Sequence, residues 1–322
     1  MQYADRPRQF RSPFATASLL PSSHGRTGVI GVRAGRRYRG CRWSLLASHA
    51  MTDFMNEDLS RSRFERVDLA GSRFRLTQFG GVEFHGCEFA DTQLRIVEMN
   101  GVTMRGVEMH NVEISGDIGN LTINGVEVAG LVEAELDRRY PERVLMRPTD
   151  AAGFREAWTV LEQLWDSTVA RARRLDPDRL HESVNGEWSF IETLRHLVLV
   201  TDGWIRRTVL GDASPWHPLG LPWDDPDETR SLPVGLTRDR AARPSLDTVL
   251  ELRRDRMATV RAIVDGLSDE SLDGNTTPVE APGWPEPRAR RLRNVLLHLF
   301  HEEWEHRLYA ERDLDALQAQ RD

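Results

Sequence analysis

Bulky apolar residues recur at every fifth position over residues 59–114, and this period restricts the possible folds more than any other feature of the chain. An α-helix repeats every ~3.6 residues and a flat strand every two, so neither accommodates a period of five. The period fits a square coil in which each side is one pentapeptide and the bulky side chain points inward. The series runs without a break through Leu59, Phe64, Leu69, Phe74, Phe79, Phe84, Phe89, Leu94, Met99, Met104, Met109 and Ile114.

Small or β-branched residues accompany this series two positions earlier, for example Ser62, Val67 and Cys87. The combined pattern resembles the pentapeptide repeat family, whose right-handed quadrilateral β-helix uses four such units per turn. The resemblance implies about three coils and a rod on the order of 15 Å tall. Stacked repeats need caps at both ends, and we expect a short capping helix over 131–139.

The surface of this rod is predicted to act as a scaffold or as a docking site for a protein partner. Some pentapeptide proteins are acidic mimics of DNA, but here Arg63, Arg66 and Arg73 are interspersed with acids. A mimic is therefore disfavoured. His85 and His110 are expected on the outer face.

Residues 1–50 differ from the rest because they contain nine arginines and a single acid, Asp5. They suit an Arg-rich transit peptide, although no clear amphipathic helix is present. They also suit a basic arm for nucleic acid, or sequence upstream of a true translation start at Met51 or Met55. We favour the start at Met51, which makes nucleic acid an unexpected partner, and expect the segment to be disordered.

Length and composition suggest more than one domain, because 322 residues exceed a typical single core. Two cysteines, Cys41 and Cys87, cannot make a disulfide framework and suit a reducing cytoplasm. No apolar run approaches the ~20 residues that span a bilayer. The chain has no lysine, which excludes mechanisms based on a Schiff-base or P-loop lysine. Any metal site must use histidine and carboxylate.

His298, Glu302 and His306 are spaced by four residues near the C-terminus, so a helix would present all three on one stripe. Imidazole and carboxylate groups one turn apart can bind the same divalent ion. His196, within the apolar run 191–200, is the best candidate for a further ligand, because a buried polar group needs a partner. A satisfied core histidine and a solvated helix face remain the alternative interpretation.

Four amphipathic helices are predicted after a linker at 141–150. They form a bundle, in which facing helices can supply the ligands of a metal. A long connection over 211–243 is expected to cover a site. The predicted ranges are about 151–174, 189–210, 245–266 and 289–313. Thr149 or Asp150 is expected to cap the first helix and Ser189 the second, and the third is expected to start at Ser245.

Gly186-Glu187-Trp188-Ser189, Leu194-Arg195-His196-Leu197 and the His298-x3-Glu302-x3-His306 pattern resemble the DinB superfamily of four-helix metalloproteins. That family includes bacillithiol and mycothiol S-transferases and mycothiol-dependent maleylpyruvate isomerase. The resemblance implies His196, Glu302 and His306 as ligands of zinc or nickel, with Glu302 replacing the usual middle histidine. His298 and His301 are expected to support or pack against the site, with His298 an alternative ligand. Trp188 should pack beside the site, whereas Glu303, Glu305 and Asp202 should lie at the surface.

The sequence thus predicts a multi-domain β + α protein. Its domains are a disordered segment (1–50), a pentapeptide β-helix (51–140), a linker (141–150) and a DinB-like four-helix bundle (151–322). The leading hypothesis is a cytoplasmic metal-dependent enzyme that transfers a low-molecular-weight thiol such as mycothiol, or a related hydrolase. The alternative is a non-enzymatic, stress-related docking module with a structural or vestigial metal. A fourth protein ligand would favour the alternative, and an open coordination position would favour catalysis.

Overall fold

The computed structural model describes residues 53–224 and 231–320. They fall into two units that meet in sequence between Ala70 and Gly71. The predicted disordered segment 1–50 and the predicted start at Met51 lie outside the described residues, and the predicted domain boundaries stay predictions. Within the described ranges, every helix is too short or too polar to cross a membrane.

The backbone of the repeat follows the same five-residue period as the sequence. A positive φ is easily adopted by glycine and asparagine but is strained for residues such as Leu76 and Ile96. Positive φ at every fifth residue therefore indicates that the repeat imposes a turn at each of these positions. Positive φ occurs at Asn56, Arg61, Arg66, Gly71, Leu76, Gly81, Gly86, Asp91, Ile96, Gly101, Gly106, Asn111 and Gly116.

The bulky side chains of the repeat are exposed, contrary to the expected inward burial. Phe64, Phe74 and Phe84 expose 57–62% of their surface. Rings at successive positions from Phe74 to Phe89 lie 5.4–6.2 Å apart, centroid to centroid. Within the described ranges, the backbone hydrogen bonds of residues 53–120 join residues three apart. No backbone hydrogen bonds there connect one coil of the repeat to the next. His85 and His110 are exposed, as expected.

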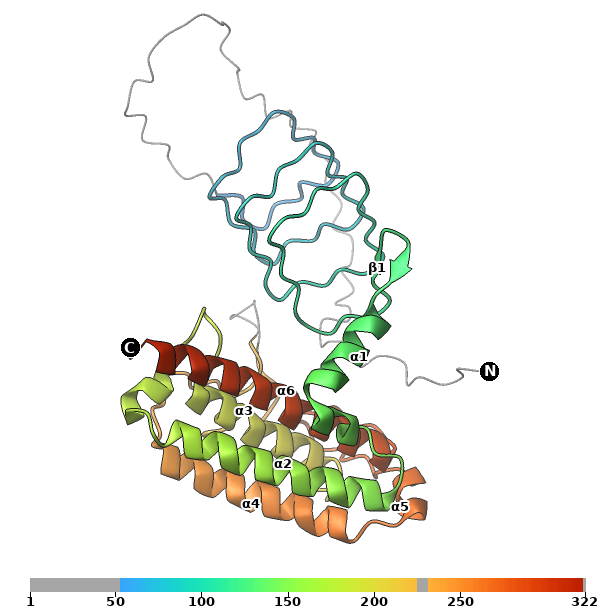
Figure 1. Ribbon diagram of the computed structural model, residues 1–322, viewed down its shortest axis with the longest axis vertical. Coiled ribbons are helices and arrows are strands. Elements are labelled where there is room, and N and C mark those ends of the chain that lie inside the picture. The colour runs from blue at the N-terminus through green and yellow to red at the C-terminus, as the bar shows by residue number, and fades with distance from the viewer. Residues whose placement is uncertain (1–52, 225–230, 321–322) are drawn as a thin grey trace, which may run out of the picture. The chain divides into compact units, whose positions relative to one another are not determined.

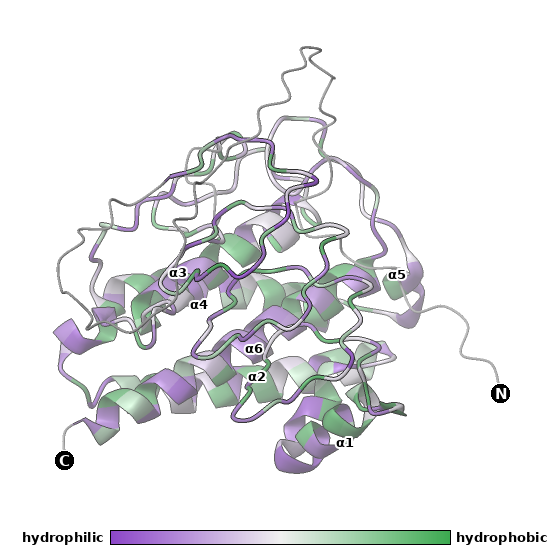
Figure 2. Cartoon of the chain, turned by 90° about the horizontal axis from the view of Figure 1, so that it is seen from above, coloured by the Kyte–Doolittle hydropathy of each residue, from purple (hydrophilic) through white to green (hydrophobic). Residues whose placement is uncertain are grey.

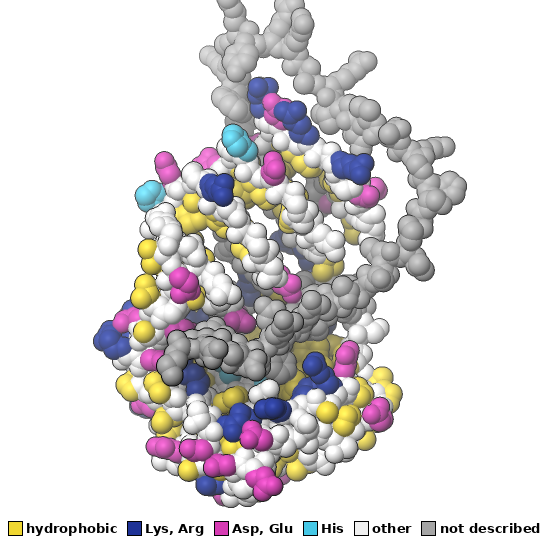
Figure 3. All heavy atoms as spheres, turned by 90° about the vertical axis from the view of Figure 1, so that its right-hand side faces the viewer, with side chains coloured by type: hydrophobic (Ala, Val, Ile, Leu, Met, Phe, Trp, Pro, Cys, Tyr) yellow, Lys and Arg dark blue, Asp and Glu magenta, His cyan; other side chains and the backbone are white. Residues whose placement is uncertain are grey.

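The described residues contain two strands, β1 (Thr122–Ile123) and β2 (Val126–Glu127), which form an antiparallel pair. The quadrilateral β-helix therefore stays a prediction. The expected helix near 131–139 is present as α1 (Ala129–Arg139), and a 3₁₀ turn, η1 (Pro141–Met146), follows it. On the face drawn in Figure 3, acidic and basic side chains are interspersed rather than segregated by sign.

Four long helices form the C-terminal domain, close to the predicted ranges: α2 (Ala151–Ala172), α3 (Phe190–Thr201), α4 (Leu246–Asp265) and α6 (Leu292–Ala319). They run alongside one another in Figure 1. Helices α2 and α3 each pack against both α4 and α6, so α4 and α6 lie on opposite corners. Short helices η2 (Pro177–His181) and α5 (Asp269–Asp273) occupy the connections.

Local sequence signals account for the helix starts. Asp150 and Ser245 accept backbone hydrogen bonds at the starts of α2 and α4, and Ser189 and Glu192 form the predicted capping box of α3. The second predicted helix differs, because α3 ends at Thr201 and continues as a π-helical turn, η3 (Asp202–Arg207). Hydrophobic and hydrophilic sides of the helices are visible in Figure 2.

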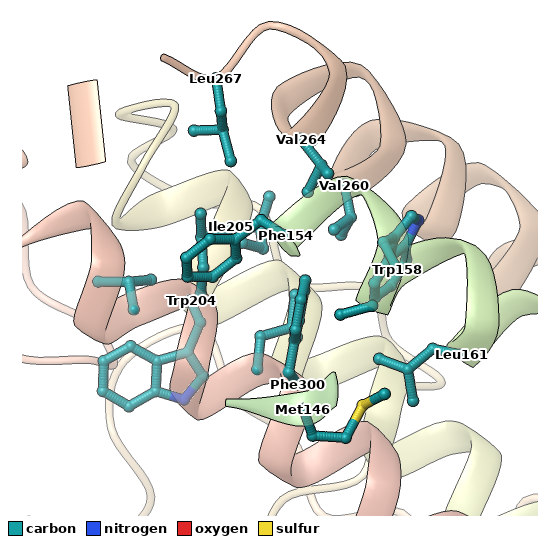
Figure 4. Packing of buried hydrophobic residues seen from close by; sticks show 14 of the residues in the cluster. Met146, Phe154, Trp158, Leu161, Trp204, Ile205, Val260, Val264, Leu267 and Phe300 are labelled. Carbon is teal, nitrogen blue, oxygen red and sulfur yellow. The ribbon is translucent and has the colours of Figure 1, made fainter. Parts of the chain in front are cut away.

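Aromatic residues from two helices form the centre of the bundle. Phe300 stacks on Trp158 at 5.6 Å and lies 5.4 Å from Phe154 between ring centroids. All three side chains are fully buried and point toward one another in Figure 4. Burying each such side chain contributes about 1.5–3 kcal/mol, so this cluster is a main source of stability.

Two ion pairs cross the interior, both from arginines of α4. Arg253 donates to both oxygens of Glu303 at 2.7 Å, and Arg256 donates to both oxygens of Asp202 at 3.0 and 3.2 Å. The prediction that Glu303 and Asp202 lie at the surface was therefore wrong, since both are fully buried. A carboxylate is tolerated there because a guanidinium neutralises it.

Two further buried arginines hold the long connections through backbone carbonyls. Arg195 of α3 donates to the carbonyls of Leu219, Asp239 and Ala242. Arg207 donates to the carbonyls of Pro285, Ala213, Val279 and Ala281. These contacts fix the loops that follow η3 and α5, including the connection that was predicted to cover a site.

Removing one member of the Arg253–Glu303 pair should destabilise the domain. Glu303→Ala leaves a buried guanidinium without a carboxylate, so we expect the free energy of unfolding to fall by about 3–5 kcal/mol. The double variant Arg253→Met/Glu303→Leu removes both charges and should lose much less. Urea unfolding followed by circular dichroism measures both changes. Equal losses in the single and double variants would contradict this account of the pair.

Candidate metal centre

The predicted ligands come together between two neighbouring helices. His196 projects from α3, while Glu302 and His306 project from α6. One ligand atom from each lies within 4.8 Å of the others. His196 Nε2 is 3.9 Å and His306 Nδ1 is 3.4 Å from Glu302 Oε2. The convergence of these three groups, with mixed imidazole and carboxylate donors, fits a divalent cation such as zinc.

Backbone carbonyls orient both imidazole rings. His196 Nδ1 lies 2.9 Å from the carbonyl oxygen of Leu221, and His306 Nδ1 lies 2.8 Å from that of Glu302. A carbonyl accepts only, so each Nδ1 carries the proton and donates it. The lone pair of each ring is then on Nε2, the form in which histidine binds a metal.

The electrostatics keep Glu302 and His306 in the protonation states that a cation requires. Burial raises the pKa of Glu302, but the interactions with His196, His306 and His298 in their protonated forms outweigh it and lower the pKa to about 2. Burial, with a contribution from His196, lowers the pKa of His306 to about 4. At neutral pH, Glu302 is therefore an anion and His306 a neutral donor.

Aromatic rings cover the site on one side. Trp188 lies 4.5 Å from the ring of His196 and 6.0 Å from that of His306, and the two histidine rings stack at 4.8 Å between centroids. Trp188 thus packs beside the site, as predicted. The side chains of Glu302 and His306 are still 22% and 17% exposed, so the site is reachable from solvent.

His298 is placed behind the carboxylate rather than among the three converging ligands. Its Nε2 lies 3.5 Å from Oε1 of Glu302, whereas both other histidines are nearest to Oε2. The ring of His298 also contacts Trp204 at 4.6 Å. Its position suits the predicted supporting role, in which it fixes the orientation of Glu302.

Two neighbouring predictions need correction. His301, expected to support or pack against the site, is exposed, and Glu305, expected to be solvated, is half-buried. Helical geometry explains the first, because residue 301 is turned ~100° from the stripe that carries Glu302. Sequence reasoning also missed the carbonyl of Leu221, which is 25 residues from its histidine and has no side-chain signal.

The family comparison supports the resemblance for this part of the chain. Residues 160–310 match the family model of the DinB superfamily. The helical domain is therefore DinB-like, and His196, Glu302 and His306 all lie inside the matched range. No curated protein and no solved structure shows a significant match to the chain.

Substitution of any converging residue should abolish metal binding. We expect the purified full-length chain to hold about one divalent cation, and His196→Ala, Glu302→Ala and His306→Ala each to hold almost none, because two remaining donors bind weakly. Elemental analysis after dialysis measures the content. Retention of a full equivalent by two or more of these variants would show that the ion binds elsewhere.

His298 should tune the affinity without being required for binding. His298→Ala frees Oε1 of Glu302, and we expect the metal affinity to fall about 10–100-fold while the stoichiometry is kept. His301→Ala, an exposed neighbour on the same helix, is the matched control and should not change the affinity. Competition with a chromophoric chelator measures the constants. An unchanged affinity in His298→Ala would remove this supporting role.

Proposed function

We propose that the DinB-like domain is a metal-dependent enzyme that transfers a low-molecular-weight thiol, of the mycothiol type, to an electrophilic acceptor in the cytoplasm. Zinc or nickel bound by His196, Glu302 and His306 is the proposed cofactor, and hydrolysis is a variant of the same chemistry. The observation that carries the proposal is the donor count: within the described residues, three ligand atoms converge. Catalytic sites of this type leave a position for substrate, whereas structural sites close it with a fourth ligand.

A cation with these ligands would supply Lewis acidity, lowering the pKa of a thiol or water in the open position. Neighbouring groups of the chain orient the three ligand side chains for binding this cation. Leu221 fixes His196, the helix backbone fixes His306, and His298 lies against the outer oxygen of Glu302. In the transfer itself the thiol loses its proton, sulfur bonds to an electrophilic carbon, and the leaving group departs with its electron pair.

Residues 51–140 have a separate part in this proposal. We propose that they form the pentapeptide β-helix and serve as a scaffold or docking module for a protein partner. The five-residue recurrence of positive φ supports this assignment, together with the unbroken apolar series in the sequence.

Thiol consumption tests the enzymatic proposal directly. The full-length chain, loaded with zinc or nickel, is incubated with mycothiol and a fluorogenic alkylating acceptor such as monochlorobimane. We expect a rate well above the background reaction, and loss of that rate in His306→Ala because the metal site is broken. Arg254→Gln, which removes an exposed charge on α4, is the control. A metal-loaded protein no faster than His306→Ala would reject thiol transfer and favour the docking-module alternative.

A further inference from the structure

A small hollow with an excess of positive charge lies in the loop that precedes α6. Its lining includes Arg207, Arg288 and Arg290, two threonines and one acid, Glu286. It is open to solvent and has room for about one oxygen-sized group, such as a single oxygen atom of an anion, rather than for a whole substrate. Three guanidinium groups against one carboxylate leave this hollow electropositive, which favours an anion.

Arg290 differs from the other arginines near the bundle interior in its hydrogen bonding. Arg253 and Arg256 pair with carboxylates, and every nitrogen of the Arg207 guanidinium donates to a carbonyl. In Arg290, Nη1 donates to the carbonyls of Glu286 and Arg288 at 3.1 and 3.0 Å. Its Nε and Nη2 donate to no group among the described residues, and neither atom is sealed from solvent.

The backbone of Arg290 is fixed, so the guanidinium is presented from a rigid segment. Its N–H donates to Oγ1 of Thr276, and its carbonyl accepts from the Thr276 N–H. The side chain is half-buried, and burial lowers its pKa, with a further contribution from Arg288. Among the described residues no carboxylate accepts a hydrogen bond from this guanidinium, so an anion can take that place.

One indole ring separates this guanidinium from the residues of the metal centre. The guanidinium carbon of Arg290 lies 5.3 Å from the ring centroid of Trp204. The same ring lies 4.6 Å from that of His298, which contacts Glu302. Burial is the main cause that lowers the pKa of His298, and the positive charge of Arg290 contributes to the effect.

We infer that the hollow at Arg290 binds a carboxylate or phosphate group of the acceptor molecule that reacts at the metal centre. This inference rests on the proposed function for its biological meaning, but anion binding itself does not require the metal. The Nε and Nη2 donor atoms of one planar guanidinium match the paired oxygens of either group. The site therefore selects acidic acceptors over neutral ones of the same shape.

Anion binding to the full-length chain tests the inference without activity. Inorganic phosphate and succinate are titrated separately by calorimetry into the wild type, Arg290→Gln, Arg290→Lys and Arg254→Gln. We expect Arg290→Gln to weaken binding about ten- to hundredfold, Arg290→Lys to retain part of it, and Arg254→Gln to behave as wild type. The anion whose binding depends on Arg290 identifies the acidic group. Thermal unfolding of each variant verifies that it is folded.

The same titration in His306→Ala separates this inference from the proposed function. Binding that persists there, even if the chain proves inactive, supports the anion site on its own. Equal affinity of wild type and folded Arg290→Gln and Arg290→Lys for both anions, or no binding by the wild type, overturns it whatever the metal content.

Selectivity gives a second readout on the loaded enzyme. ω-Iodoalkanoates of increasing length are compared with their amides as acceptors, which differ only in charge. We expect a lower KM for one or more acids than for the matching amides, and loss of that preference in Arg290→Gln but not in Arg254→Gln. Equal KM values for every acid and its amide overturn the proposed selection of acidic acceptors.

Discussion

The rotation of α6 about its own axis decides whether a metal centre exists, and a buried ion pair fixes that rotation. Glu302 and Glu303 are adjacent, so their side chains leave the helix ~100° apart. Glu303 is held in the interior by Arg253 from the opposite corner of the bundle. With Glu303 anchored, Glu302 and His306 face α3, where His196 lies.

The second ion pair fixes the position of the end of α3 in the same way. Arg256 is one helical turn from Arg253 on α4 and binds Asp202, the first residue of the π-helical turn. Buried pairs of this kind contribute little net stability compared with apolar residues of similar size. Here they join α4 to α6 and to the end of α3. The geometry of the candidate centre thus depends on charges that lie outside it.

Local features of the sequence predicted the helices and the ligands, whereas long-range partners escaped prediction. Ser189 and Glu192 cap α3 through contacts three residues apart, and the spacing of Glu302 and His306 needs only helical periodicity. His196 was identified from its apolar neighbours and from the DinB resemblance. The burial of Glu303 and Asp202 was missed because it depends on arginines about 50 residues away in sequence. No local sequence pattern predicts such a pairing. In the repeat, positive φ values recur with the same period of five. The predicted burial of the phenylalanines would require backbone hydrogen bonds between successive coils, which the described residues lack.

The anchoring of loops by Arg195 and Arg207 has a consequence for how this domain can change. Both guanidinium groups bind main-chain oxygens, and every amino acid supplies the same oxygen. Substitutions in the anchored loops can therefore alter size, charge and polarity around the centre while the loops keep their attachment points. In such a scaffold, substitutions in the loops can change which substrates are accepted without changing the fold. These loops are therefore suitable positions for directed evolution.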